Sequence, residues 1–392
     1  MITVAEINDI ERLSGLRLLW RSLWGQTRNT SLFESFEWLE NYWRHFGKDK
    51  KLRTLVVAVA GKPIGIVPLV VKLVPSRLGP VRALMYPLDS WGAFYGPIGP
   101  SRSATLLAAL RHLHQTRRDW DMIDLGYVDL QRTDRGRTQN ALRSAGLQSC
   151  RRVWQQTARV DTMATWESYW ASRSNACRQE YEFAEETLSQ IGTVTFERYR
   201  PRGMMYGDTD RRRDLFNTFE EMFVTDQRAE SRRRQNGSIE KGARFLRDMH
   251  GAAVDAGGLD LNVLSLNSKP VAFAYNFQWE GIVESVCLTV APESIPGTGA
   301  VLAGRMLRDS FERGDRSFVF AHHDREFGRT WQTSTQTSYR YTHFARMNPR
   351  AQVLRLNQLL KSWIVDDVSV EAPVLQPCET DADARPKLVV VG

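Results

Sequence analysis

Apolar and polar residues recur along the chain with spacings that predict a mixture of helices and strands. In "SFEWLENYWRHFG" the apolar side chains follow helical spacing up to Gly47, a typical helix-ending residue. The next stretch, "LRTLVVAVAGKPIGIVPLVV", has two strand-like runs around Ala60 to Pro63 and predicts a hairpin. The strand-like "VRALMYPL" then leads through the Gly- and Pro-rich "DSWGAFYGPIGP" to a helix, "SATLLAALRHLHQ", and a short strand, "WDMIDLG".

The same order of elements returns later in the chain. The segment "LDLNVLSLNSKPVAFAYNFQW" again predicts strand, turn and strand, and Lys269-Pro270 matches Lys62-Pro63. A strand "GIVESVCLTV", a loop "APESIPGTG", a helix "AVLAGRMLRDSFERG" and a strand "RSFVFAHH" follow. Two helix-like stretches precede this second unit, "TWESYWASRSNACRQEYEFAEETLSQIG" and "RRRDLFNTFEEMFVTDQRAESRRR". The recurrence indicates an internal duplication of one α/β unit.

The duplication gives three expected regions. Residues 1–160 form the first unit, residues 161–347 the second, and residues 348–392 a C-terminal extension. The extension begins with a helix pattern, "RAQVLRLNQLLKSW", and continues from Asp366 as an acidic tail with little periodicity, which is typical of disorder.

Composition narrows the class of protein. No apolar run reaches about 18 residues, so no membrane span is expected. The N-terminal "MITVAEINDIERL" has no basic and apolar regions of a secretory signal, and the four cysteines form no CxxC pair. These features favour a cytoplasmic protein with neither disulfides nor a metal site. The net charge of +8 attracts anions, and arginines cluster at 211–213 and 232–234. Either cluster is a solvated helix face or a contact for nucleic acid.

The turn in "ESIPGTGAVLAGRMLRDSF" has a composition suited to phosphate. A strand, a glycine-rich turn and a helix place free backbone N–H groups at a helix N-terminus, where the helix dipole attracts anions. Gly297 and Gly299 allow close approach, and Thr298 caps the helix or binds a phosphate oxygen. The turn lacks the third glycine of a dinucleotide-binding fingerprint, because Leu302 stands there, and it lacks the GK[ST] of a Walker A loop. Alone, this turn is equally explained as a loop without a ligand.

The spacing Ser294-x-x-Gly297-x-Gly299 is similar to the R/Q-x-x-G-x-G/A pyrophosphate loop of GCN5-related N-acetyltransferases (GNAT), with Ser294 in place of Arg or Gln. Roughly residues 30 to 345 resemble one bacterial branch of that superfamily, the CelD-like acyltransferases related to the FemAB peptidoglycan aminoacyltransferases. The matching segments are "FESFEWLENYWRHFG", "VVAVAGKPIGIVPLV", "NVLSLNSKPVAFAYNF", "SIPGTGAVLAGRML" and "FVFAHHDREFGRTWQ". In the last segment Phe318, Phe320, Asp324 and Trp331 fit F-D-F-x-x-G-D-E-x-Y-K-x-x-W, whereas Val319, His323 and Gly328 replace its Asp, Gly and Lys.

The resemblance implies an α/β (α+β) fold of two tandem GNAT-like domains, each a mixed sheet flanked by helices. It also implies that the second domain binds acetyl-CoA or another acyl-CoA as substrate. Residues 294–300 (Ser294, Gly297, Thr298, Gly299 and Ala300) then cradle the pyrophosphate, and the backbone from Leu288 to Val290 meets the thioester. In the first domain the corresponding loop carries Asp89, Trp91 and Tyr95, but Pro97 and Pro100 remove N–H donors. We therefore expect that domain to have lost CoA and to shape the acceptor cleft.

Transfer to an amine needs a base, an oxyanion donor and an acid for the thiolate. Glu284 is a charged residue in an apolar strand and becomes a usable base if it is buried, or a solvent-facing side chain if it is not. His322, His323 and Asp324 end the following strand, where clefts open, and Tyr339 or Tyr341 is a candidate acid. Cys287 is expected to be an inert packing residue.

Three functions follow. The first is an N-acyltransferase acting directly from acyl-CoA on an amino sugar, a cell-envelope precursor or a polyamine. The second keeps the fold but takes an aminoacyl group from tRNA, which the arginine clusters favour. The third is a degenerate scaffold in exopolysaccharide biosynthesis, which the replacements at Val319, His323 and Gly328 favour.

Overall fold

The computed structural model describes residues 1–76, 79–89, 91–231, 239–345, 352–353 and 355. The first half of the chain comprises β1 (Ile2–Ile7), α1 (Ile10–Ser14), α2 (Arg17–Gly25), η1 (Leu32–Glu34), α3 (Phe36–Phe46), β2 (Lys50–Val59), β3 (Lys62–Val74), β4 (Val81–Met85), α4 (Arg102–Gln115), β5 (Met122–Val128), the π-helical turn η2 (Leu130–Asp134), α5 (Arg137–Ser144) and β6 (Cys150–Asp161).

The second half comprises α6 (Trp166–Ala171), α7 (Asn175–Ile191), β7 (Val194–Tyr199), η3 (Met204–Tyr206), α8 (Arg213–Ser231), α9 (Ile239–Ala256), β8 (Leu259–Leu266), β9 (Lys269–Trp279), β10 (Ile282–Val290), α10 (Thr298–Glu312), β11 (Ser317–Val319), η4 (His322–Asp324), α11 (Arg325–Trp331) and β12 (Ser334–Phe344). After α6 and α7, its order of long elements repeats that of the first half, so the predicted duplication of an α/β unit is confirmed.

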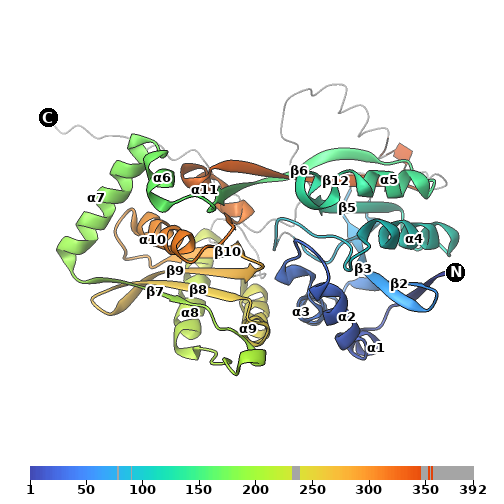
Figure 1. Ribbon diagram of the computed structural model, residues 1–392, viewed down its shortest axis with the longest axis horizontal. Helices are drawn as coiled ribbons and strands as arrows, with labels where there is room; N and C mark the ends of the chain where they lie inside the picture. The colour runs from blue at the N-terminus through green and yellow to red at the C-terminus, as the bar shows by residue number, and fades with distance from the viewer. Residues whose placement is uncertain (77–78, 90, 232–238, 346–351, 354, 356–392) are drawn as a thin grey trace.

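All these strands form one mixed sheet of 12 strands, in the order β1-β2-β3-β4-β5-β12-β6-β11-β10-β9-β8-β7. The two halves exchange their last strands. β12 of the second half pairs with β5 of the first half, and β6 of the first half pairs with β11 of the second half. β6 and β12 also pair with each other, and Figure 1 shows them crossing from one half to the other. The expected boundary at residue 160 falls at the end of β6, where the sheet is continuous, and the domain limits stay a prediction.

The local patterns predicted the central elements well. The hairpin between β2 and β3 turns at Ala60 and Gly61, both with positive φ (49° and 76°), as a tight two-residue turn requires. The predicted strand "RSFVFAHH" is shorter than expected, because only Ser317–Val319 pair before the chain turns into η4. The sequence did not reveal β6 or β12, whose polar residues hide their strand pattern. The predicted C-terminal helix and acidic tail lie outside the described residues, apart from 352–353 and 355.

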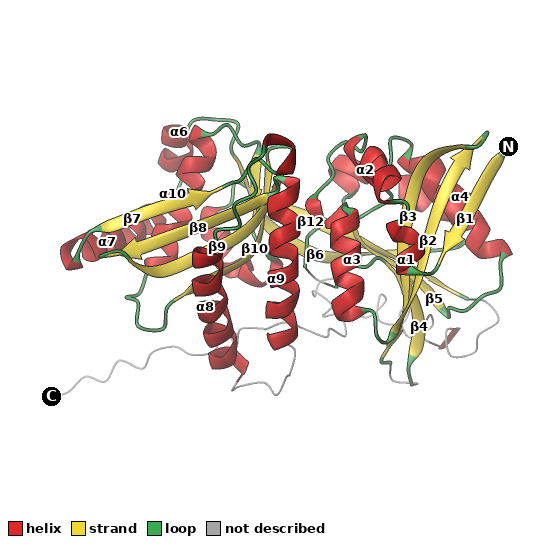
Figure 2. Ribbon diagram, turned by 90° about the horizontal axis from the view of Figure 1, so that it is seen from below, coloured by secondary structure: helices red, strands yellow, loops and turns green. Residues whose placement is uncertain are grey.

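Aromatic side chains join the two halves in one core. Trp24 stacks on Trp279 with ring centroids 4.1 Å apart, and Phe33 meets Phe277 edge-on at 5.5 Å. At the same junction α3 packs against α9, and the two helices lie side by side in Figure 2. Such buried aromatic contacts are specific and contribute beyond the area they bury. The two halves are therefore held together around the face where β9 meets η1.

Candidate functional site

Strand β10 lies at a split in the sheet. It pairs with antiparallel β9 along its length, but with parallel β11 only over Ile282–Glu284. Among the described residues, no strand pairs with the β11-facing edge of β10 beyond Glu284. A β-bulge between Ser285 and Cys287 changes the direction of the strand at the same point. The edge therefore offers backbone groups to a ligand that enters between the two strands.

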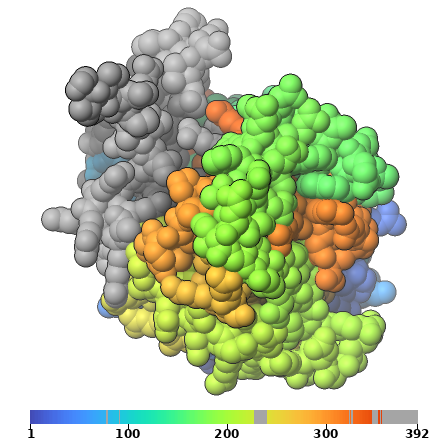
Figure 3. All heavy atoms as spheres, turned by 90° about the vertical axis from the view of Figure 1, so that its left-hand side faces the viewer, coloured from blue at the N-terminus to red at the C-terminus, as the bar shows by residue number. Residues whose placement is uncertain are grey.

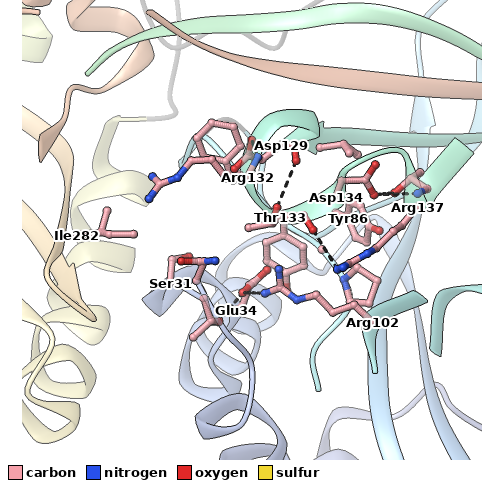
Figure 4. A pocket seen from close by; sticks show the side chains of 18 of the residues that line it. Ser31, Glu34, Tyr86, Arg102, Asp129, Arg132, Thr133, Asp134, Arg137 and Ile282 are labelled. Carbon is pink, nitrogen blue, oxygen red and sulfur yellow. Dashed lines mark hydrogen bonds and ion pairs between the residues drawn. The ribbon is translucent and has the colours of Figure 1, made fainter. Parts of the chain in front are cut away.

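A cavity of about 70 Å³ adjoins the beginning of this split, and both halves line it. The second half contributes Ile282, Glu284, Val319 and Gln336. Most of the remaining wall comes from η1, the segment 94–97, η2 and the first turns of α4 and α5. Figure 4 shows these side chains converging, with Glu34 and Arg102 facing Asp129 and Arg132 across the space. At about 15 Å³ for each water, the cavity has room for roughly five water-sized groups.

Four buried polar atoms of the cavity wall have no hydrogen-bond partner among the residues that the structure describes. They are the hydroxyls of Tyr86 and Tyr95, Nε of Arg102 and Oε1 of Gln336. Tyr86 is only 1% exposed and Tyr95 4%, so bulk water does not compensate for the missing hydrogen bonds. Buried polar groups are nearly always paired in folded proteins, because each unpaired group costs free energy. Their convergence on one cavity indicates a site for a polar ligand.

Glu284 and Glu34 bring two carboxyl groups to this cavity. Glu34 is 5% exposed, accepts a hydrogen bond from Thr30 Oγ1 and forms an ion pair with Arg102 at 3.2 Å. Burial nevertheless raises the pKa of Glu34. Glu284 is 8% exposed, and burial together with the nearby charge of Glu34 raises its pKa from 4.5 to about 8. A hydrogen bond with Ser31 acts in the opposite direction and lowers the pKa. Of the two readings that the sequence left open for Glu284, the structure therefore favours the buried one.

The predicted phosphate loop is a turn whose side chains are already engaged. Ser294 Oγ donates to the carbonyl of Val271 at 3.2 Å, and Thr298 Oγ1 donates to the carbonyl of Ile295 at 2.8 Å. Gly297 has a φ of 89°, and a Cβ there would lie 2.5 Å from the Cβ of Ala184. Ser294 and Thr298 therefore shape the loop, and the groups left for an anion are backbone N–H groups in the first turn of α10.

Two other residues of the predicted donor site, Leu288 and Val290, pack against this turn. A Cβ on Gly299 would lie 3.3 Å from Val290 Cγ2 and 3.4 Å from Leu288 Cδ2, so these strand side chains pack under the loop. Ala300 is partly buried against the same core. Helix α7 covers the turn from the other side, and Figure 3 shows its green surface between orange surfaces of the second half.

The remaining candidates do not share the cavity with Glu284. His322 is exposed, and its Nδ1 lies 3.3 Å from the carbonyl oxygen of Gln156. The side chain of His323 is not among those that the structure describes. Burial, together with the charge of Asp324, raises the pKa of the Cys287 thiol, so Asp324 lies close enough to Cys287 to act on it. Tyr339 is on β12 opposite Val128 of β5 and is not part of the cavity wall. The structure thus separates the Glu284 region from the Asp324 region along β10.

Sequence reasoning missed the part of the site that the first half supplies. Glu34 stands between Phe33 and Ser35 in "SLFESFEW", and a charged residue in an apolar stretch is the signal that singled out Glu284. Asp129 comes directly after strand β5, just as His322 and Asp324 come after β11. Its position at a strand end is therefore the same signal that singled out those two residues. No comparable signal marks Tyr86, Arg102 or Gln336.

Comparisons with known proteins agree with this geometry. Residues 175–329 match the family model described as an acetyltransferase (GNAT) domain. This segment is a GNAT-type acetyltransferase domain. The matched residues contain β10, the turn at Gly297 and α10.

Solved structures share the fold of nearly the whole chain. The crystal structure of FemX is 12% identical, with a TM-score of 0.56 over 91% of this chain and 100% of that one. A conserved protein of unknown function from Bacteroides thetaiotaomicron is 11% identical, with a TM-score of 0.55 over 88% and 100%. The C-terminal domain of a putative lysylphosphatidylglycerol synthetase from Agrobacterium fabrum is 13% identical, with a TM-score of 0.51 over 90% and 95%. At these identities the likeness concerns the fold alone. A comparison with curated proteins found no match.

Proposed function

We propose that this chain is an N-acyltransferase that moves an acyl group directly from an acyl-CoA to an amine acceptor. The observation that carries the proposal is the position of Glu284, a buried carboxyl whose raised pKa suits a general base near neutral pH. It lies where the split beside β10 meets a polar cavity. The donor approaches along the split, and the acceptor amine occupies the cavity.

The reaction follows from these positions. Glu284, once ionised, takes a proton from the acceptor ammonium and leaves the amine neutral. The amine nitrogen attacks the thioester carbonyl, and backbone N–H groups on the open edge of β10 stabilise the oxyanion. The tetrahedral intermediate collapses, the C–N bond remains and the C–S bond breaks. The nitrogen loses its second proton to give the amide, and the CoA thiolate takes up one proton in turn. Asp324, His322, His323 and Tyr339 remain candidates for that last step.

The donor site lies at the other end of β10 in this proposal. The pyrophosphate binds the first turn of α10, where N–H groups and the helix dipole face outward from Gly299 and Ala300. In the first half, the segment 94–97 lines the acceptor cavity, which supports the expectation that this half shapes the acceptor site. The described cysteines Cys150, Cys177 and Cys287 are free thiols, and no described helix is long and apolar enough to cross a bilayer. We place the reaction in the cytoplasm.

A pair of variants at Ala300 tests the donor site by calorimetric titration with acetyl-CoA. Ala300→Glu places a negative charge in the first turn of α10, whereas Ala300→Gln adds the same volume without charge. We expect micromolar binding to the wild type, a loss of at least tenfold in Ala300→Glu and a much smaller loss in Ala300→Gln. Equal losses in both variants would move the pyrophosphate away from this helix. Absence of acetyl-CoA binding in the wild type would overturn the proposed function.

The alternative of aminoacyl transfer from tRNA finds less support in the described residues. Arg212 pairs with Glu197 and Asp214, and Arg211 lies 3.4 Å from Asp255, so these guanidinium groups already have carboxylate partners. The second cluster, 232–234, lies outside the described residues. Titration with total tRNA tests this alternative, which requires tight and steeply salt-dependent binding.

The scaffold alternative rested on three departures from the family segment. One of them has a packing reason, since a Cβ at Gly328 would lie 2.7 Å from the Cβ of Ala158 on β6. A longer side chain is excluded there by the exchanged strand, so Gly328 does not indicate degeneration.

A further inference from the structure

Two arginines beside the acceptor cavity form no direct ion pair within the described part of the chain, although the charges of Asp129 and Asp161 act on Arg159 from a distance. Arg132 belongs to the turn η2 and lines the cavity, and Figure 4 shows its guanidinium extending toward Ile282. Arg159 is in β6 opposite Val319, another residue of the cavity wall. Among the described residues, neither guanidinium has a hydrogen-bond or ion-pair partner.

The two positive charges are close enough to affect each other. Burial, and next the charge of Arg132, lower the pKa of Arg159, which is half-buried. On β6, Arg159 shares a face with Thr157, whose partner in β12 is the cavity residue Gln336. Arg159 is therefore directed to the side of the sheet on which the cavity lies.

The acidic groups nearest this pair hold backbone N–H groups and form no direct ion pair with either arginine in the described structure. Asp129 Oδ1 accepts the N–H groups of Gln131 and Arg132 at 3.1 Å each, and Asp134 accepts hydrogen bonds from Gly136 and Thr138. Asp161 Oδ1 accepts the N–H of Met163 at 3.0 Å, and Arg316 adds a further positive charge near Arg159. Like charges in partial burial are unfavourable unless an anion lies between them.

We propose that Arg132 and Arg159 form an anion-binding site that recognises a phosphate or carboxylate group of the acceptor. Guanidinium groups bind both anions through charge-assisted, often bidentate hydrogen bonds. The acceptor is then a compact molecule with two charged ends, an amine placed at Glu284 and an anionic group placed at the two arginines. The acceptor role rests on the proposed function, whereas anion binding by this pair does not depend on it.

The test compares small probes in the wild type and in Arg132→Gln and Arg159→Gln, with Arg111→Gln as the matched control. Arg111 is exposed on α4 and outside the cavity wall. Calorimetry measures the affinities of phosphoethanolamine, β-alanine and ethanolamine, which share an amine and differ in the anionic group. We expect the wild type to bind the better of the two anionic probes at least tenfold more tightly than ethanolamine, and each cavity variant to lose most of that preference. The stronger of the two anionic probes identifies phosphate or carboxylate.

Thermal unfolding with inorganic phosphate or acetate gives a second reading that is independent of catalysis. The favoured anion should raise the unfolding temperature of the wild type and of Arg111→Gln more than that of either cavity variant, because ligand binding stabilises the folded state. The unfolding temperatures without anion also show whether each variant is folded.

Three results would overturn the proposal. The wild type could bind ethanolamine as tightly as both anionic probes, or the cavity variants could keep the preference. Alternatively, the cavity variants could lose affinity for acetyl-CoA while keeping the preference, and the arginines would then serve the donor. Failure of the proposed function looks different, since the wild type would then bind the anionic probes through these arginines but not acetyl-CoA.

Discussion

The variant Glu284→Gln tests two properties of Glu284, its proposed role as general base and its burial. Gln has nearly the same shape as Glu, so the cavity wall beside Ser31 and Glu34 is preserved. It cannot take a proton from an ammonium group, and we expect the rate to fall by about 10²–10⁴-fold. In the wild type, kcat should rise with pH until Glu284 is ionised near pH 8.

The structure also gives the size of an effect on stability. Raising the pKa of Glu284 from 4.5 to about 8 corresponds to about 5 kcal/mol, at about 1.36 kcal/mol for each pH unit. The folded state binds this proton more tightly than the unfolded chain does. The stabilisation is therefore fully present below pH 4.5, decreases as the pH rises, and is lost above pH 8. Gln has no such proton, so the variant should gain stability relative to the wild type as the pH rises.

Urea unfolding at intervals from pH 5 to pH 9 measures this difference. We expect the free energy of unfolding of Glu284→Gln, minus that of the wild type, to increase by roughly 4 kcal/mol over that range. Glu312→Gln is the control, because Glu312 is exposed and its ion pair is an i,i+4 pair with the equally exposed Arg308. A difference that stays flat with pH would show that Glu284 titrates normally, and the argument for a buried base would be wrong.

Three further substitutions test other parts of the structure. Gly297→Ala should destabilise the protein by about 1–3 kcal/mol and weaken acetyl-CoA binding, since Ala at φ 89° meets Ala184; unchanged urea unfolding would contradict this. Asp260→Asn should cost about 1–3 kcal/mol in urea unfolding at pH 7, because the buried Arg198 loses its partner at 2.8 Å and keeps those in Asp309 and Asp315. Arg198 and Arg200 lower the pKa of Asp260, so the difference between this variant and the wild type should shrink as the pH falls, and a constant difference would refute the pairing. Cys287→Ala should keep its kcat and lose about 1 kcal/mol of stability, whereas loss of turnover without unfolding would make the thiol catalytic.

The sequence by itself determined the local units and their repetition. Apolar spacing and turn residues act over a few neighbours, so the hairpins, the helix α10 and the duplicated order of elements could be read directly. The same local reading recognised Gly297 as special. It attributed that glycine to a ligand, which stays a prediction, and the structure adds a second reason for it in the positive φ and the closeness of Ala184.

Only the tertiary structure decided which residues meet. The sequence marked Glu284 as an unusual charge but could not tell burial from exposure, because Ser31 and Glu34 lie some 250 residues earlier in the chain. The exchange of β6 and β12 was equally hidden, since strand pairing between distant segments depends on the fold and not on either strand's own pattern. The cavity and the two arginines beside it lie where the two halves meet, and no local pattern encodes a site whose walls come from both halves of the chain.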